Sequence, residues 1–70
     1  MKSKYNIGDR VKISRMLSPV GHWQQIDPLT AEVVDIKPTV SLGIAYTLEV
    51  NGERLHVCYW ESDIDGRAND

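Results

Sequence analysis

The chain of 70 residues contains no phenylalanine and only one cysteine, Cys58, so no disulfide within the chain can stabilise it. It also lacks any apolar run near the ~18 residues of a membrane-spanning helix. Its start, Met1-Lys2-Ser3-Lys4, leads into polar residues and does not resemble a secretion signal. We therefore expect no membrane contact and a cytoplasmic location, where reducing conditions suit a lone cysteine.

The chain carries little net charge, because ten acidic and eight basic residues leave a balance of -2. A protein that binds the nucleic acid backbone presents a basic face, so this balance argues against a nucleic acid partner. Hydrophobic residues make up 41% of the chain, which is too many for a disordered segment. We expect a single domain over residues 1–70, with an ordered core over 5–64 and a polar tail over 65–70. A chain this short buries only about 60% of its unfolded surface, so a closed sheet or self-association must add stability.

The Asn51-Gly52 dipeptide predicts a β-hairpin, because a two-residue type I′ turn needs positive φ at both positions. Two alternating runs flank it over residues 42–60. Counting outward from the turn gives the cross-strand pairs Val50–Glu53, Glu49–Arg54, Leu48–Leu55, Thr47–His56, Tyr46–Val57, Ala45–Cys58, Ile44–Tyr59 and Gly43–Trp60. One face of this hairpin is apolar. The other carries the mixed set Thr47, Glu49, Arg54, His56, Cys58 and Trp60.

The remaining residues predict shorter strands and one long loop. Strict alternation over 10–14 predicts a strand with Val11 and Ile13 facing inward. Residues 29–37 predict a second strand, whose apolar positions change phase and so call for a β-bulge near Val33 and Val34. Residues 15–28 hold two of the three prolines and no sustained periodicity, which predicts a long loop. Residues 61–64 predict a 3₁₀ turn that returns Ile64 to the core.

Four or five short strands with a tight hairpin favour a small barrel, because closure removes sheet edges. In residues 5–11 (Tyr-Asn-Ile-Gly-Asp-Arg-Val), 31–36 (Ala-Glu-Val-Val-Asp-Ile) and 61–64 (Glu-Ser-Asp-Ile), the chain resembles the SH3-like barrels. The resemblance implies an all-β, five-stranded SH3-like barrel with a long first loop and an Asn-Gly hairpin. The expected core residues are Ile7, Val11, Ile13, Val34, Ile36, Ile44, Tyr46, Leu48, Leu55, Val57 and Ile64.

A second resemblance rests on residues 8–11 (Gly-Asp-Arg-Val), on Trp23-Gln24 and on Tyr59. In these residues the chain is similar to the plasmid-borne type B dihydrofolate reductases, which are SH3-like barrels of comparable length. The resemblance implies a homotetramer with one central pore that binds folate and a nicotinamide cofactor. In that family a Val-Gln-Ile-Tyr stretch lines the pore. Here the stretch reads His56-Val57-Cys58-Tyr59, so Tyr59 is kept and the glutamine is absent.

His56 and Cys58 are candidate metal ligands or catalytic residues, since they share one face of a strand. His22 is a third candidate metal ligand. A structural zinc site needs four ligands at recognisable spacing, which these residues do not supply. Side chains two residues apart on a strand lie about 7 Å apart, too far for His56 to activate Cys58 directly. We expect no metal, no cofactor and no self-contained catalytic site.

Trp60 and Trp23 are the candidate recognition residues, because tryptophan is enriched at interface hot spots. Trp60 shares a face with Thr47, His56 and Cys58, and this face carries less charge than a typical exposed strand. Each tryptophan also has a structural interpretation, in which Trp23 caps one barrel end and Trp60 covers the opposed Gly43.

The sequence favours a small non-catalytic interaction module. It would be homo-oligomeric through the face formed by Thr47, His56, Cys58 and Trp60, and would bind a protein partner through the long loop or this hairpin face. One alternative is an oligomeric enzyme with a shared central site, which would bind a nicotinamide or pterin ligand. A second is a tudor-like or KOW-like module, in which Tyr5, Trp23 and Tyr59 gather around a methylated side chain or a stacked base.

Overall fold

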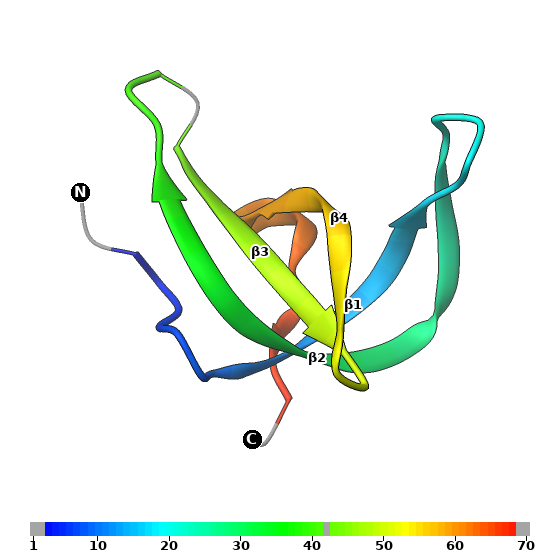
Figure 1. Ribbon diagram of the computed structural model, residues 1–70, viewed down its shortest axis with the longest axis horizontal. Coiled ribbons are helices and arrows are strands. Elements are labelled where there is room, and N and C mark those ends of the chain that lie inside the picture. Colours follow the sequence, from blue (N-terminus) through cyan, green and yellow to red (C-terminus); the bar gives the residue numbers. More distant parts are fainter. Residues whose placement is uncertain (1–2, 42, 69–70) are drawn as a thin grey trace.

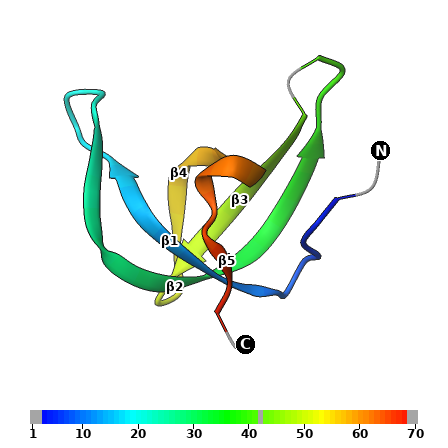
Figure 2. The same ribbon diagram turned by 180° about the vertical axis from the view of Figure 1, so that it is seen from behind.

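The computed structural model describes residues 3–41 and 43–68, which form one antiparallel β-sheet. Its elements are β1 (Arg10–Leu17), β2 (Trp23–Pro38), β3 (Ile44–Val50), β4 (Glu53–Trp60), a 3₁₀ turn η1 (Glu61–Asp63) and β5 (Gly66–Arg67). The strand order across the sheet is β4-β3-β2-β1-β5. Figures 1 and 2 show a strongly curved sheet, in which the ends of the β1–β2 and β2–β3 hairpins rise as two arms on either side of β4.

The all-β, five-stranded architecture predicted from the sequence is confirmed, whereas closure of the barrel is not. β4 lies at one edge of the sheet and β5 at the other, and no ladder joins these edges within the described residues. The same part of the chain contains no helix of the length and apolarity needed to cross a membrane.

Residues 15–28 were expected to form a long loop, and this prediction is wrong. β1 continues to Leu17 and β2 begins at Trp23, so only residues 18–22 form a turn. The Ser18 N–H donates to the His22 carbonyl at 2.7 Å, and Gly21 adopts φ of +88°, which closes that turn. The ladder shifts register between Ile13 and Arg15 of β1, opposite the β2 residues 26–28 that include Pro28. Proline has no ladder donor and is tolerated at such irregularities, so the strand survives a residue that breaks its sequence pattern.

The predicted bulge in the second strand is confirmed, because the β2–β3 ladder shifts register between Val33 and Asp35. The bulge places Ala31 and Val33 in the core and leaves Ile36 packed against its rim. Val34, which was expected in the core, is only half-buried. The change of phase therefore buries the first pair of apolar residues more deeply than the second.

The Asn51-Gly52 turn is confirmed, with φ of +53° and +81°, as are the two pairs next to it, Val50–Glu53 and Glu49–Arg54. Beyond them the predicted register is wrong by two residues. The observed pairs are Thr47–Cys58, Tyr46–Tyr59 and Ala45–Trp60, so Trp60 lies opposite Ala45 and not Gly43. A shift of two preserves the alternation of faces, so Leu55, Val57 and Tyr59 still face inward.

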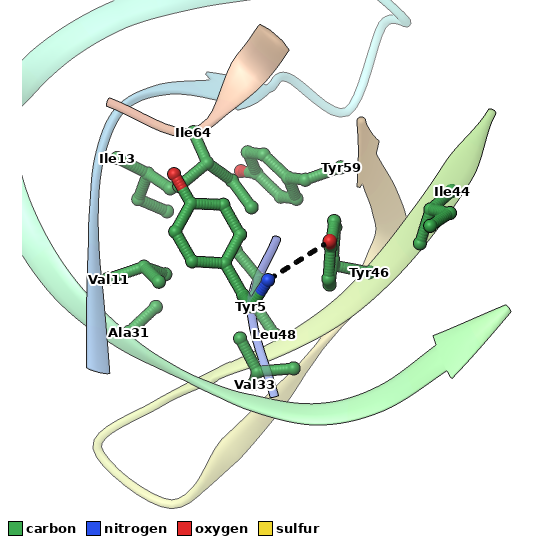
Figure 3. Close-up of a cluster of buried hydrophobic side chains, with 10 residues drawn as sticks. All are labelled: Tyr5, Val11, Ile13, Ala31, Val33, Ile44, Tyr46, Leu48, Tyr59 and Ile64. Atoms are coloured by element: carbon green, nitrogen blue, oxygen red, sulfur yellow. Dashed lines mark hydrogen bonds between the residues drawn. The ribbon is translucent and has the colours of Figure 1, made fainter. Parts of the chain in front are cut away.

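The core fills the concave side of the sheet (Figure 3). Six of the expected core residues are buried: Val11, Ile13, Ile44, Tyr46, Leu48 and Ile64. Three more, Ile36, Leu55 and Val57, pack partly buried against them. Ile7 is 65% exposed, because it lies in a turn closed by the bond from the Asp9 N–H to the Asn6 carbonyl. Tyr5 and Tyr59 fill the core in its place.

The 3₁₀ turn expected at residues 61–64 is confirmed, and the chain after it is more ordered than predicted. The Asp65 N–H donates to the Lys12 carbonyl and the Ala68 N–H to the Arg10 carbonyl, each at 2.9 Å. Between them β5 pairs with Val11 and Lys12. The expected frayed tail is therefore a fifth strand as far as it is described, while residues 69–70 and Leu42 lie outside the described residues.

Candidate functional site

The outer face of the β3–β4 hairpin brings together most of the predicted site residues. Thr47 lies directly opposite Cys58, and Trp60 lies on the same face. His56 and Cys58 are exposed, whereas Thr47 and Trp60 are half-buried. None of the three hollows described below is lined by Thr47, Cys58 or Trp60.

Trp23, the fifth predicted site residue, does not join this face. It begins β2 on the β1–β2 arm (residues 14–28), and its ring packs edge to face against Tyr59, with centroids 5.5 Å apart. Tyr59 is buried and points to the opposite side of β4 from Cys58 and Trp60. Trp23 thus covers the inner side of the hairpin while remaining 44% exposed, which agrees with its interpretation as a cap.

An apolar groove lies between the β1–β2 arm and β4, and we call it the β1–β4 groove. It has a volume of about 270 Å³, and its apolar lining comes from Met16 and Leu17 on β1 and from Leu55, Val57 and Tyr59 on β4. Glu53, Arg54 and His56 complete the lining with polar groups of both charge signs. Leu55 and Val57 are only half-buried, although they face the core side of the sheet. The groove is therefore the place where the open sheet exposes apolar side chains that a closed barrel would cover.

The groove runs along a strand edge that has unused pairing capacity. β4 is the terminal strand of the sheet, so its far side has no neighbouring strand among the described residues. On its near side the ladder passes from the Glu49–Arg54 pair directly to the Thr47–Cys58 pair. Residues 55–57 therefore have no ladder partner in β3, and they occupy the stretch of β4 that lines the groove.

Away from the groove, side-chain hydrogen bonds around Tyr46 fasten the N-terminal segment over the core, and we call this region the closed end. Its hydroxyl accepts from the backbone N–H groups of Lys4 and Tyr5, at 3.1 and 3.3 Å, and donates to the Glu61 carboxylate at 3.1 Å. The Tyr5 ring packs edge to face against the Tyr46 ring (Figure 3). Burial raises the pKa of Tyr46 above its ordinary value of 10.0, and the neighbouring Glu61 carboxylate acts in the same direction.

Arg67 of β5 ties the N-terminal segment to this closed end. Its guanidinium donates to the Lys4 carbonyl and to Asp9 Oδ2, and it lies 5.4 Å from the Tyr5 ring centroid. The pKa of Asp9 is held below its ordinary value of 3.8, first by the hydrogen bond it accepts from the Asn6 N–H and then by Arg67. The same residues thus fix the backbone and satisfy its polar groups.

Two side-chain contacts connect β4 and η1 to β1 at the groove end. The Tyr59 hydroxyl donates to the Arg15 carbonyl at 2.9 Å, and Arg15 Nη1 pairs with Asp63 Oδ1 at 3.1 Å. Burial raises the pKa of Tyr59 above 10.0, with a smaller contribution from the Asp63 charge. These contacts hold β1 and β4 at a fixed separation, and they do so with side chains and not with a β-ladder.

Two further hollows have linings with a larger polar share than the β1–β4 groove. One of about 310 Å³ lies beside Trp23 and is lined by Ser14, Arg15, Gln24 and Gln25 as well. The other, of about 240 Å³, lies on the outer face near the Asn51-Gly52 turn, where Arg10, Glu32 and Glu49 follow one another across β1, β2 and β3. Neither combines a strand edge with apolar lining as the β1–β4 groove does.

The described residues bring no three histidine, cysteine, aspartate or glutamate side chains together in a way that could hold a metal ion. Tyr5, Trp23 and Tyr59 do not form an aromatic cage, because Tyr5 packs with Tyr46 at the closed end while Trp23 and Tyr59 form a separate pair. Of the stretch compared with the reductase pore, His56, Val57 and Tyr59 line the groove, whereas Cys58 does not line it and is exposed on the outer face.

The groove was missed from the sequence because one of its walls, Met16 and Leu17, lies in residues 15–28, which were interpreted as a loop. The signal was nevertheless there, since Leu55, Val57 and Tyr59 alternate in period two and Met16-Leu17 directly continues the first strand. Comparisons of this chain with protein-family models, with curated proteins and with solved structures each returned no match.

Proposed function

We propose that this protein is a small non-catalytic interaction module on an SH3-like scaffold, and that it binds an extended segment of a protein in the β1–β4 groove. The scaffold part of the proposal is supported by the strand order and by the 3₁₀ turn η1 that leads into β5 on the far side of β1. The fold alone does not give a function, so the groove carries the argument.

The single observation behind the proposal is the coincidence of half-buried apolar side chains with an unpaired strand edge. Leu55 and Val57 line the groove from β4, whose far edge has no neighbouring strand in the described part of the chain. An added strand would use that edge for backbone hydrogen bonds and would place every second side chain against the apolar lining. The hollow of about 270 Å³ can accept a few side chains, which fits a strand better than it fits a large cofactor.

A selection from a library of random peptides tests this proposal. Peptides that bind should share apolar residues at alternate positions, and the substitution Val57→Lys should weaken their binding at least tenfold. Val40→Lys is the matched control, because Val40 is fully exposed and does not line the groove. Recovery of no peptide, or of peptides that bind the Val57→Lys protein equally well, would refute the proposal.

A further inference from the structure

The outer face of β4 has a charge pattern that complements itself when two copies of the strand run antiparallel. Arg54 stands at the beginning of the strand and Trp60 at its end, with His56 and Cys58 between them. In an antiparallel pair of identical strands, the cationic end of one strand therefore meets the aromatic end of the other. A guanidinium over an indole ring is a favourable contact, and the indole is the best of the aromatic partners.

The inner face of β4 selects the register. Cross-strand partners must share a face, so in an antiparallel pair of identical strands one residue lies opposite its own copy, beside the two-fold axis. The overlap of the two β4 strands is longest when this residue is Val57 or His56. With Val57 opposite its own copy, Leu55 meets Tyr59 and the inner face is apolar throughout. With His56 opposite its own copy, Glu53 meets the buried Tyr59, which places a carboxylate on the apolar inner face.

We propose that the extended segment bound in the β1–β4 groove is β4 of a second copy of this chain, paired antiparallel about Val57. Rows of opposed residues then cross the interface on each face. Arg54 lies against Trp60 and His56 against Cys58 on the outer face, and Leu55 lies against Tyr59 on the inner face. This inference rests on the proposed function of the groove and names its occupant.

The edge of β4 is open to such pairing. Native proteins protect free edges with lysine, proline or inward-pointing charges, and residues 54–60 contain none of these. The added strand pairs with the far side of β4, which has no neighbouring strand among the described residues. It also brings the Leu55 and Val57 side chains of the second copy toward Met16 and Leu17 on the other side of the groove.

The only cysteine of the chain makes the register measurable. His56→Cys places a second thiol opposite Cys58 of the other copy, so mild oxidation should yield a covalent dimer with two disulfides. The two thiols of one copy, two residues apart on a strand, lie about 7 Å apart and cannot bridge to each other. Arg54→Cys is the register control, since its thiol would meet Cys58 only with the axis beside His56. Val40→Cys, at a fully exposed position of the β2–β3 turn, is the control for random collisions.

Light scattering of the wild-type protein under reducing conditions completes the test. A paired strand is a small interface, so the mass should rise toward twice 7.9 kDa as the concentration approaches about 1 mM. The proposal predicts this rise, loss of it in Val57→Lys with circular dichroism unchanged, and rapid cross-linking of His56→Cys alone.

A wild-type mass that stays monomeric at every concentration would overturn the inference, as would cross-linking that is fastest in Arg54→Cys or equal in Val40→Cys. The irregular β3–β4 ladder would then act as protection of the edge. Such a result would leave the proposed function standing if selected peptides still lose affinity for Val57→Lys. Failure of both measurements would remove the groove as a binding site.

Discussion

The closed end around Tyr46 and the groove end around Tyr59 cover the hydrophobic core to different extents. At the Tyr46 end, one hydroxyl and one guanidinium join β3, η1, β5 and the N-terminal segment, and the aromatic rings between them are buried. At the groove end, β1 and β4 are joined by the Tyr59–Arg15 hydrogen bond and the Arg15–Asp63 ion pair, and Leu55 and Val57 remain half-buried. A small sheet can therefore be closed in one region by polar side chains and keep a partly exposed apolar surface in another.

Both regions pack on one hydrophobic core, so a substitution in that core should lower the free energy of unfolding most. Leu48 is fully buried, and Leu48→Ala should lower the free energy of unfolding by about 2–5 kcal/mol, because it leaves a cavity between the ends. Urea unfolding followed by fluorescence measures this loss. Val40→Ala at a fully exposed site should stay within about 0.5 kcal/mol of wild type. Equal effects of the two substitutions would show that the core has been misplaced.

The closed end should be more sensitive to loss of a hydroxyl than the groove end. Tyr46→Phe removes three hydrogen bonds and leaves Glu61 without the donor it uses here, so a loss of about 1–3 kcal/mol is expected. Tyr59→Phe removes one bond to a carbonyl and should cost about 1 kcal/mol. Denaturant midpoints of the two variants give the ratio of their stability losses. A larger loss for Tyr59→Phe than for Tyr46→Phe would contradict the expectation.

The pH dependence of stability should also report on the closed end. The pKa of Asp9 is lowered in the folded state, so its ionised form stabilises the fold above the unfolded value near 3.8, and that contribution disappears as the pH falls through the folded pKa. Thermal unfolding at pH 6 should therefore show wild type more stable than Asp9→Asn, with the difference vanishing by about pH 2. A difference that persists at acidic pH would mean that the carboxylate charge plays no part.

The smallest effect should come from the ion pair at the groove end. The Arg15 side chain is half exposed, so Arg15→Ala should change the free energy of unfolding by no more than about 1 kcal/mol, since surface pairs are screened by water and salt. The same measurement in 1 M salt should bring the two proteins closer together. A loss of several kcal/mol would show that this pair holds the groove end together as firmly as Tyr46 holds the other.

Local patterns predicted the parts of the fold that depend on one or two residues. The alternation around Val11 and Ile13 placed β1, and Asn51-Gly52 placed the hairpin turn and its first two pairs. Prediction failed where a tertiary contact overrides the pattern. Pro28 interrupts the sequence pattern of a strand that pairing with β1 stabilises. The β3–β4 register shifts after Arg54, and the type of the hairpin turn does not predict this shift.

The candidate site was predictable only in part, for the same reason. Thr47, Cys58 and Trp60 share the predicted face because alternation survives a shift of two residues. Trp23 was separated from them by the arm that carries it, and the groove depends on the approach of two segments distant in sequence, Met16-Leu17 and Leu55–Tyr59. The expected core omitted Tyr5 and Tyr59, although the alternation of the hairpin already places Tyr59 on its apolar face.

Amide hydrogen exchange in dilute protein tests most directly whether one end of the sheet is closed and the other open. We predict slow exchange for the Lys4 and Tyr5 amides, which donate to the Tyr46 hydroxyl, and fast exchange for residues 55–57, which lack ladder partners. Equal protection of the two groups, or stronger protection of residues 55–57 in the monomer, would contradict the account.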